Sequence, residues 1–266
     1  MSPVPTAALA VLAAAYLTGA RRTPGWSPRA TTAFLAGIAA LAVTLESPLH
    51  SRGEELLSVH MVQHLLLTLV VPPLLVLGRP LALALRGGPR RTRRPIADLL
   101  RSRTVRALTH PAVAFAVFAA VLVGTHAPAF YDLALRDEAV HDVEHALYFY
   151  SALLFWQVVL APEPHPHASS PIVRMLLLLG AMLPTAVVGV GLLTAGHVVY
   201  PTYALRAAGH GAAMADQRTG GSIMWLWGTL GLAVAVLTAG WWGVVREERR
   251  ALAREAALER ALGGRS

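Results

Sequence analysis

Long apolar segments are the feature that most restricts how this chain can fold. A helix that crosses a bilayer needs roughly 20 mostly apolar residues, and about seven segments have that character: residues 4–20, 29–46, 56–77, 111–128, 140–161, 172–195 and 221–245. They do not alternate apolar and polar residues as membrane barrel strands do, and a helix satisfies its own backbone hydrogen bonds inside lipid. We therefore predict an all-α polytopic membrane helix bundle of about seven transmembrane helices, forming one domain over residues 1–245.

The charge content supports this class. Only 14% of the residues are charged, whereas soluble domains carry about 25%. The apolar N-terminal run has no basic residue before it, so we expect a retained span and not a cleaved signal peptide. The net charge of +8 raises the question of nucleic acid, but in a membrane protein such an excess is typical of loops that face anionic lipid. We expect the lipid bilayer, and no nucleic acid, as a partner.

Arginine is distributed unevenly between the two sides of the predicted bundle. All 23 basic residues are Arg, and 19 of them fall in the C-terminal segment or in, or within three residues of, the loops after the first, third and fifth spans. The other side holds only Arg52, Arg136, Arg206 and Arg218. Positive charge marks the cytoplasmic side, so we predict an outer N-terminus and a cytoplasmic C-terminus. The charged segment 246–266 is expected to form a helical cytoplasmic tail.

Histidines crowd on the predicted outer side. Four of them form two HxxxH pairs, His60 with His64 in HMVQH and His141 with His145 in HDVEH. Residues at i and i+4 share a helix face, with Cβ atoms about 5–6 Å apart, and such a pair can share a metal ion, as in HExxH. Eight of the eleven histidines fall on this side: His50, His60, His64, His126, His141, His145, His197 and His210. The remaining three, His110, His165 and His167, face the cytoplasm.

The two pairs, together with Asp216 before the last span, are predicted to form a metal site. Ionisable groups at membrane depth are costly and tend to be functional. We place His126, Glu144, Asp142 and His197 as possible supporting residues around it. The chain has no Cys, which excludes thiolate ligands, and imidazole suits copper, zinc and other divalent metals alike. The competing interpretation is that the imidazoles make polar helix–helix contacts and that Asp216 caps the last span.

Two consecutive prolines, Pro72 and Pro73, interrupt the third apolar segment. Proline has no N–H and its ring clashes with the carbonyl four residues earlier. We therefore expect a kink or break in this span, with freed carbonyls that must find other partners.

Three motifs in this order, HMVQHLLLTLVVPPLLVLGRP, HDVEHALYFYSALLFW and DQRTGGSIMW, resemble the CtaG family of bacterial cytochrome c oxidase assembly factors. The resemblance extends from about residue 26 to residue 245. It implies a multi-pass protein of the bacterial plasma membrane that is needed to mature a haem–copper oxidase. It also implies a cytochrome c oxidase subunit as partner and copper handled on the outer face. The family's motif residues correspond here to His60, His64, His141, His145 and Asp216.

Other functions are compatible with the same residues. The histidine pairs could bind haem, or another metal, in a membrane redox protein. The protein could transport a metal, although the predicted cytoplasmic half lacks a matching set of ligands, or it could be a scaffold whose histidines serve packing alone. We find no P-loop, dinucleotide-binding fingerprint or nucleophile elbow, so no enzymatic activity is expected. The oligomeric state is left open.

Overall fold

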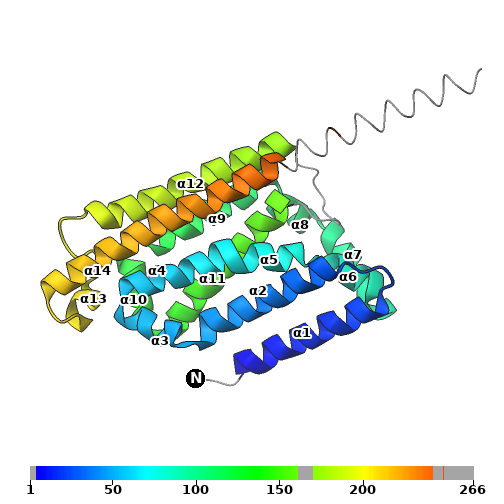
Figure 1. The fold of residues 1–266 in the computed structure, drawn as a ribbon, viewed down its shortest axis with the longest axis horizontal. Helices are drawn as coiled ribbons and strands as arrows, with labels where there is room; N and C mark the ends of the chain where they lie inside the picture. The colour runs from blue at the N-terminus through cyan, green and yellow to red at the C-terminus, as the bar shows by residue number, and fades with distance from the viewer. Residues whose placement is uncertain (1–3, 161–169, 242–247, 249–266) are drawn as a thin grey trace, which may run out of the picture.

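The computed structural model describes residues 4–160, 170–241 and 248, and within these ranges all the regular elements are helices (Figure 1). Two of them are single π-helical turns, η1 and η2, and the helix that contains η2 continues to Trp241. The elements are α1 (Val4–Arg22), α2 (Pro28–Glu46), α3 (Pro48–Glu55), α4 (Leu57–Leu65), η1 (Leu66–Val70), α5 (Val71–Leu77), α6 (Pro80–Gly87), α7 (Arg90–Arg101), α8 (Arg103–Leu108), α9 (Pro111–Thr125), α10 (Pro128–Ala134), α11 (Glu138–Leu160), α12 (Pro171–Thr194), α13 (Pro201–Arg206), α14 (His210–Ser222) and η2 (Ile223–Trp227).

The predicted all-α bundle is confirmed. Among the described residues, five helices are long and apolar enough to cross a membrane, and the bent pair α9–α10 makes a sixth if it is counted as one span. Large apolar side chains such as Leu183 and Leu237, 68% and 72% exposed, lie on the outside of the bundle, where a bilayer would cover them. α1 forms where a first span was predicted but does not meet the same criterion. The count of seven spans and the orientation therefore stay predictions, and the predicted tail 246–266 lies outside the described residues, apart from Glu248.

Two helix boundaries differ from the predicted spans. The third span continues to Gly87, well past residue 77, and the last one begins at His210, not at residue 221. The predicted last span did not include residues 210–220 because they are polar on average, yet these residues form regular helix. Asp216 therefore lies inside α14, and the expectation that it caps the last span is wrong.

The two prolines are accommodated without the predicted break. The π-helical turn η1 comes directly before them, and Pro72 stands in the first turn of α5, where a missing N–H is tolerated. The carbonyl of Thr68, four residues before Pro72, accepts a hydrogen bond of 2.7 Å from the buried indole N–H of Trp156 on α11. The expectation that a freed carbonyl would need another partner is thus confirmed, and this contact ties the third span to α11.

The two ends of the bundle differ in composition. The arginine-rich helices α7 and α8 lie at one end, and the short helices α3, α10 and α13 lie at the other (Figure 1). Ser47 both ends α2 and caps α3 with its side chain, and Pro48 occupies the first turn of α3, as is common at helix starts. This immediate restart packs α3 against α4 and brings residues of the α2–α4 connection to the end of the bundle where the histidines gather.

Candidate metal centre

The two HxxxH pairs meet in the interior of the bundle. His60 and His64 come from α4, and their rings lie 4.4 Å apart between centroids. His141 and His145 come from α11, with ring centroids 4.2 Å apart. Between the pairs, the centroid of His60 lies 5.3 Å from that of His141 and 5.8 Å from that of His145. All four side chains are buried, so the structure brings together the four histidines that helical spacing had singled out.

Glu144 lies at the centre of this group. Its carboxylate oxygens are 3.7 Å from Nε2 of His60 and 3.8 Å from Nε2 of His64, and all three side chains are buried. These distances are too long for hydrogen bonds, and the ligand atoms of Glu144, His60 and His141 all lie within 4.8 Å of one another. The sequence had placed Glu144 only in a supporting position, but the structure gives it a position equal to that of the histidines.

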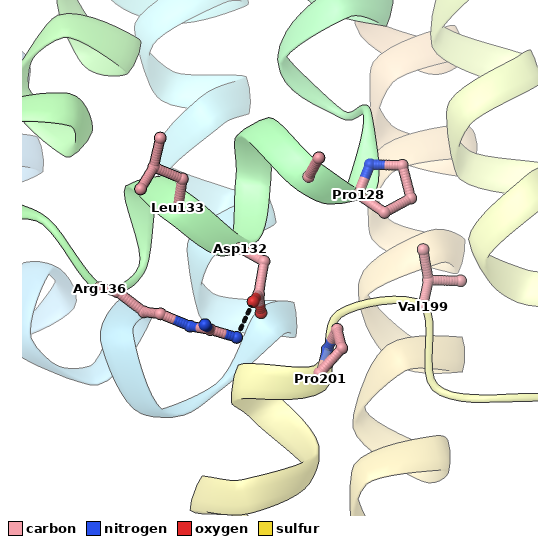
Figure 2. A pocket seen from close by; sticks show the side chains of 7 residues that line it. Pro128, Asp132, Leu133, Arg136, Val199 and Pro201 are labelled. Carbon is pink, nitrogen blue, oxygen red and sulfur yellow. Dashed lines mark hydrogen bonds and ion pairs between the residues drawn. The ribbon is translucent and has the colours of Figure 1, made fainter.

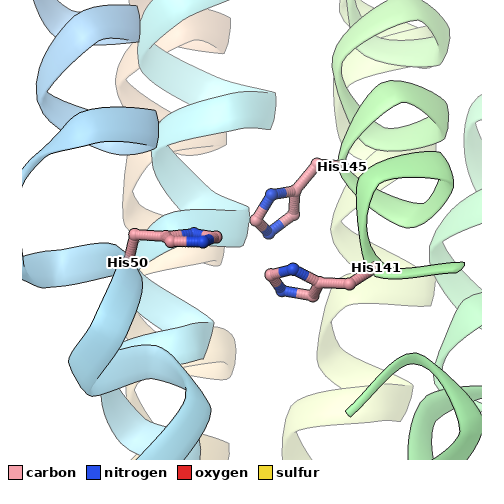
Figure 3. A group of neighbouring side chains, drawn as sticks. All are labelled: His50, His141 and His145. Carbon is pink, nitrogen blue, oxygen red and sulfur yellow. The ribbon is translucent and has the colours of Figure 1, made fainter. Parts of the chain in front are cut away.

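A fifth histidine joins the group from α3. His50 is half-buried, and its ring centroid lies 5.4 Å from that of His141 and 6.1 Å from that of His145. Figure 3 shows the three rings facing one another, one from α3 and two from α11. His50 was predicted to lie on the outer side and was not placed among the candidate ligands. The Ser47-Pro48 pair indicates only that a helix starts there, so the sequence carried no signal for the contact between His50 and α11.

Unsatisfied polar atoms are concentrated in this cluster. In the described part of the chain, buried polar atoms without a hydrogen-bond partner include Nδ1 of His50, Nε2 of His60, both ring nitrogens of His64, both carboxylate oxygens of Glu144, Nε2 of His145 and Nε2 of His126. Buried polar atoms are normally paired, and each unpaired one costs free energy. A bound cation would satisfy several of them at once, so the donor set fits a metal ion.

Three overlapping groups of side chains have ligand atoms within 4.8 Å of one another. The first, which we call the mouth group, is His50, His141 and His145. The second, the middle group, is His60, His141 and Glu144. The third, the inner group, is His60, His64 and His145. Any of them could supply three protein ligands to one ion, and together they supply five imidazoles and one carboxylate.

Tyr203 of α13 sets the tautomer of His60. The Tyr203 hydroxyl donates to the carbonyl of Gly53 at 2.7 Å and lies 3.0 Å from Nδ1 of His60. Burial raises the pKa of Tyr203 well above its ordinary value, so the phenol keeps its single proton. Because that proton is used on Gly53, Nδ1 of His60 must donate to the phenol oxygen. The lone pair of His60 is then on Nε2, which points toward Glu144, and this is the form that a metal requires.

His126 adjoins the inner group. Its Nδ1 donates to the carbonyl of Leu122 at 2.7 Å, so the lone pair is on the buried Nε2. The ring centroid of His126 lies 5.6 Å from that of His64. Tyr148 stacks on His64, with ring centroids 4.0 Å apart. His126 therefore adjoins the cluster, although its ligand atoms are not part of the three groups.

The short helices α10 and α13 cover the cluster. Tyr131 of α10 stacks on Tyr200, with ring centroids 4.0 Å apart, and lies 5.2 Å from His60 between centroids. Asp132 pairs with Arg136 and accepts a hydrogen bond of 2.8 Å from the backbone of Thr202. A surface pocket of about 450 Å³ lies beside the contact between α10 and α13 (Figure 2). It is lined by Pro128, Ala129, Asp132, Leu133, Arg136, Val199 and Pro201. Its charged groups are satisfied by each other and by α13, so we assign this pocket to the packing of the cover.

Asp216 supports the cluster from outside. One of its oxygens accepts a hydrogen bond of 2.6 Å from the backbone N–H of Leu57, and the other accepts the hydroxyl proton of Ser58. The carboxylate therefore caps the N-terminus of α4, the helix that carries His60 and His64. Asp142 and His197 are exposed, and neither belongs to the three groups of ligand atoms. Of the predicted site residues, these three thus lie apart from the buried rings.

Replacing Asp216 separates a capping role from a ligand role. Asp216→Ala should cost about 0.5–2 kcal/mol of unfolding free energy, the usual cost of losing a side-chain N-cap. Asp216→Asn should restore most of that loss, because Asn also caps well, and should leave metal stoichiometry unchanged. Denaturant titration in detergent measures the first effect and metal analysis the second. A normal stability together with lost metal in Asp216→Asn would instead assign Asp216 to the ligands.

Comparison with known proteins identifies relatives of the whole membrane domain. A family model described as cytochrome c oxidase caa3 assembly factor (Caa3_CtaG) matches residues 13–244. The chain is 31% identical over 264 residues to uncharacterized proteins of Mycobacterium bovis and Mycobacterium tuberculosis, covering 94% of this chain and 40% of each relative. An uncharacterized protein of Mycobacterium leprae is 27% identical over 244 residues, covering 86% of this chain and 36% of the relative. The chain thus spans less than half the length of these relatives. No solved structure matches it.

Proposed function

Since the chain belongs to the family of caa3 cytochrome c oxidase assembly factors, CtaG, we propose that it binds copper in its histidine–glutamate cluster and delivers it to an oxidase subunit. The observation that carries this proposal is the set of buried, unpaired ligand atoms shared by α3, α4 and α11. A scaffold that used histidines only for packing would be expected to pair them.

The arrangement favours a single ion over a haem. Within each group the ligand atoms lie within 4.8 Å of one another, which suits one ion that is bound directly by side chains. Two axial imidazoles of a haem must instead stand on opposite faces of a wide macrocycle. The rings of His60 and His141 meet at a steep interplanar angle of 84° with centroids 5.3 Å apart, and the fully buried Glu144 lies beside them.

Copper is the metal that the family function favours. Imidazole ligands suit copper and zinc, and copper has the highest affinity in the divalent series. The client of the family is a cytochrome c oxidase, an enzyme class that contains copper. With no Cys in the chain, the cluster suits Cu(II), or Cu(I) held by two imidazoles.

The position of the cluster suits delivery. It lies at the end of the bundle opposite the arginine-rich helices α7 and α8 (Figure 1), which is the predicted outer end in the bacterial plasma membrane. Copper bound there would be cargo, to be passed to a partner subunit outside the cytoplasm and not held permanently.

Metal analysis of the purified protein tests the proposal. The protein in detergent, loaded with copper under oxidising or reducing conditions and then desalted, should retain copper in a stoichiometric amount. The His60→Ala/His145→Ala variant should retain none, because each of the three ligand groups contains at least one of these residues. His210→Ala, which removes an exposed histidine outside the cluster, is the matched control and should bind as the wild type does. A wild-type protein that retains no copper would refute the proposal.

A further inference from the structure

The histidine cluster has a graded structure. We propose that His50 is the entry ligand of a two-stage site: copper is captured by the mouth group and then moves to the inner group. This inference rests on the proposed function and adds a direction and a first contact to it. Neither the family resemblance nor the helical spacing of the histidines singles out His50.

Burial increases from one side of the cluster to the other. His50 is half-buried, His141 and His145 are each 5% exposed, and His60, His64 and Glu144 are 0% exposed. Solvent therefore reaches the mouth group at His50, while the inner group is shielded by α10, α13 and the surrounding core. An ion that arrives from water must meet the mouth group first.

The groups share ligands in a way that permits transfer without release. The mouth group and the middle group share His141, the middle and inner groups share His60, and the mouth and inner groups share His145. An ion can exchange His50 for His60, and then His145 for Glu144, while it stays bound to His141. It reaches the inner group by exchanging Glu144 for His145, and then His141 for His64, while it stays bound to His60. Each step breaks one metal–ligand bond as another forms, and the charge of the ion does not change.

Charge favours the inward direction. The mouth and inner groups each consist of three imidazoles, but the fully buried Glu144 of the middle group lies 3.7 Å from His60 and 3.8 Å from His64. A carboxylate in a buried position attracts a cation far more strongly than a neutral ring does. The exposed carboxylates of Glu54 and Asp142 lie close enough to His141 to act on it electrostatically, and such exposed charges raise the local concentration of cations at an entrance.

The rate of copper uptake tests this inference. Stopped-flow mixing of the detergent-solubilised protein with copper(II) bis-glycinate should show that His50→Ala loads at least about tenfold more slowly than the wild type, on the scale at which supporting groups alter metal sites. Its final stoichiometry should be unchanged, because the inner group is intact. Ala favours helix, so the fold of α3 should survive, and His210→Ala serves as the control for losing a histidine.

A second variant tests the inner group. His64→Ala should take up copper at the wild-type rate but lose it to a competing chelator much faster, because only the mouth and middle groups remain. Equal uptake rates for His50→Ala and the wild type would overturn the two-stage site while leaving copper binding in place. Loss of all copper from His50→Ala would overturn it as well, since His50 would then belong to a single site. If the wild type bound no copper, the proposed function itself would fail. That result is distinct from both outcomes for His50→Ala, in which the wild type still binds copper.

Discussion

Cells in which His64 and His145 are both replaced by Ala should accumulate the protein in the membrane at a normal level and yet assemble an oxidase depleted of copper. Both ring nitrogens of His64 and Nε2 of His145 lack hydrogen-bond partners, so their removal breaks no protein–protein hydrogen bond at those atoms. The inner group loses two of its three ligands. Immunoblotting of membranes measures the protein level, and mass spectrometry of the purified oxidase measures its copper.

The control for this experiment removes the same number of histidines outside the cluster. His197→Ala/His210→Ala changes two exposed histidines and should leave oxidase copper unaffected. If His64→Ala/His145→Ala instead removed the protein from the membrane, the two single variants would show which change is responsible, and His64→Phe would restore the packing against Tyr148 that His64→Ala loses. Recovery of both the protein and the oxidase copper in His64→Phe would mean that His64 serves packing and would contradict its role as a ligand.

The local part of this site follows from sequence periodicity. His60 and His64 share a face because they are four residues apart on a helix, and the same holds for His141 and His145. The apolar segments around them restrict both to membrane-spanning helices. The expectation that all four would meet needed only the assumption that α4 and α11 face each other. Glu144 was predicted next to its pair for the same reason, although its central position was not.

The long-range contacts could not be predicted in this way. Tyr203 fixes the tautomer of His60 from 143 residues away, and Asp216 caps α4 from 159 residues away. Such contacts depend on how helices pack, which periodicity does not report. Asp216 was associated with the ligands because it is acidic and near the predicted start of a span. The structure shows that the helix begins earlier and that the carboxylate faces the start of another one.

The energetics of the metal-free cluster connect its structure with its function. Burying Glu144 with two unpaired oxygens imposes a desolvation cost that its neighbours do not offset through hydrogen bonds. A bound cation would pair with the carboxylate and offset this cost. Neutralising Glu144 should therefore destabilise the copper-bound protein but not the metal-free protein.

Glu144→Gln should weaken copper binding strongly and should not destabilise the metal-free protein. Loss of one charged partner at a buried pair costs about 3–5 kcal/mol, which corresponds to an affinity loss on the order of 100-fold or more. Without metal, the neutral amide has nearly the same shape and a smaller desolvation cost, so unfolding should need the same or more denaturant. Competition with a copper chelator measures the affinity, and denaturant titration of the metal-free protein measures its stability.

The matched control is Asp142→Asn, which neutralises an exposed carboxylate two residues away on the same helix and should leave the copper affinity within a few fold of wild type. The alternative role for Glu144 is a structural ion pair with protonated His60 and His64, which lie 3.7 and 3.8 Å away. That role predicts the reverse pattern, because removing the carboxylate would leave buried positive charge uncompensated and destabilise the metal-free protein. A stable metal-free Glu144→Gln protein with weakened copper binding therefore assigns the carboxylate to the metal, and an unstable one assigns it to the fold.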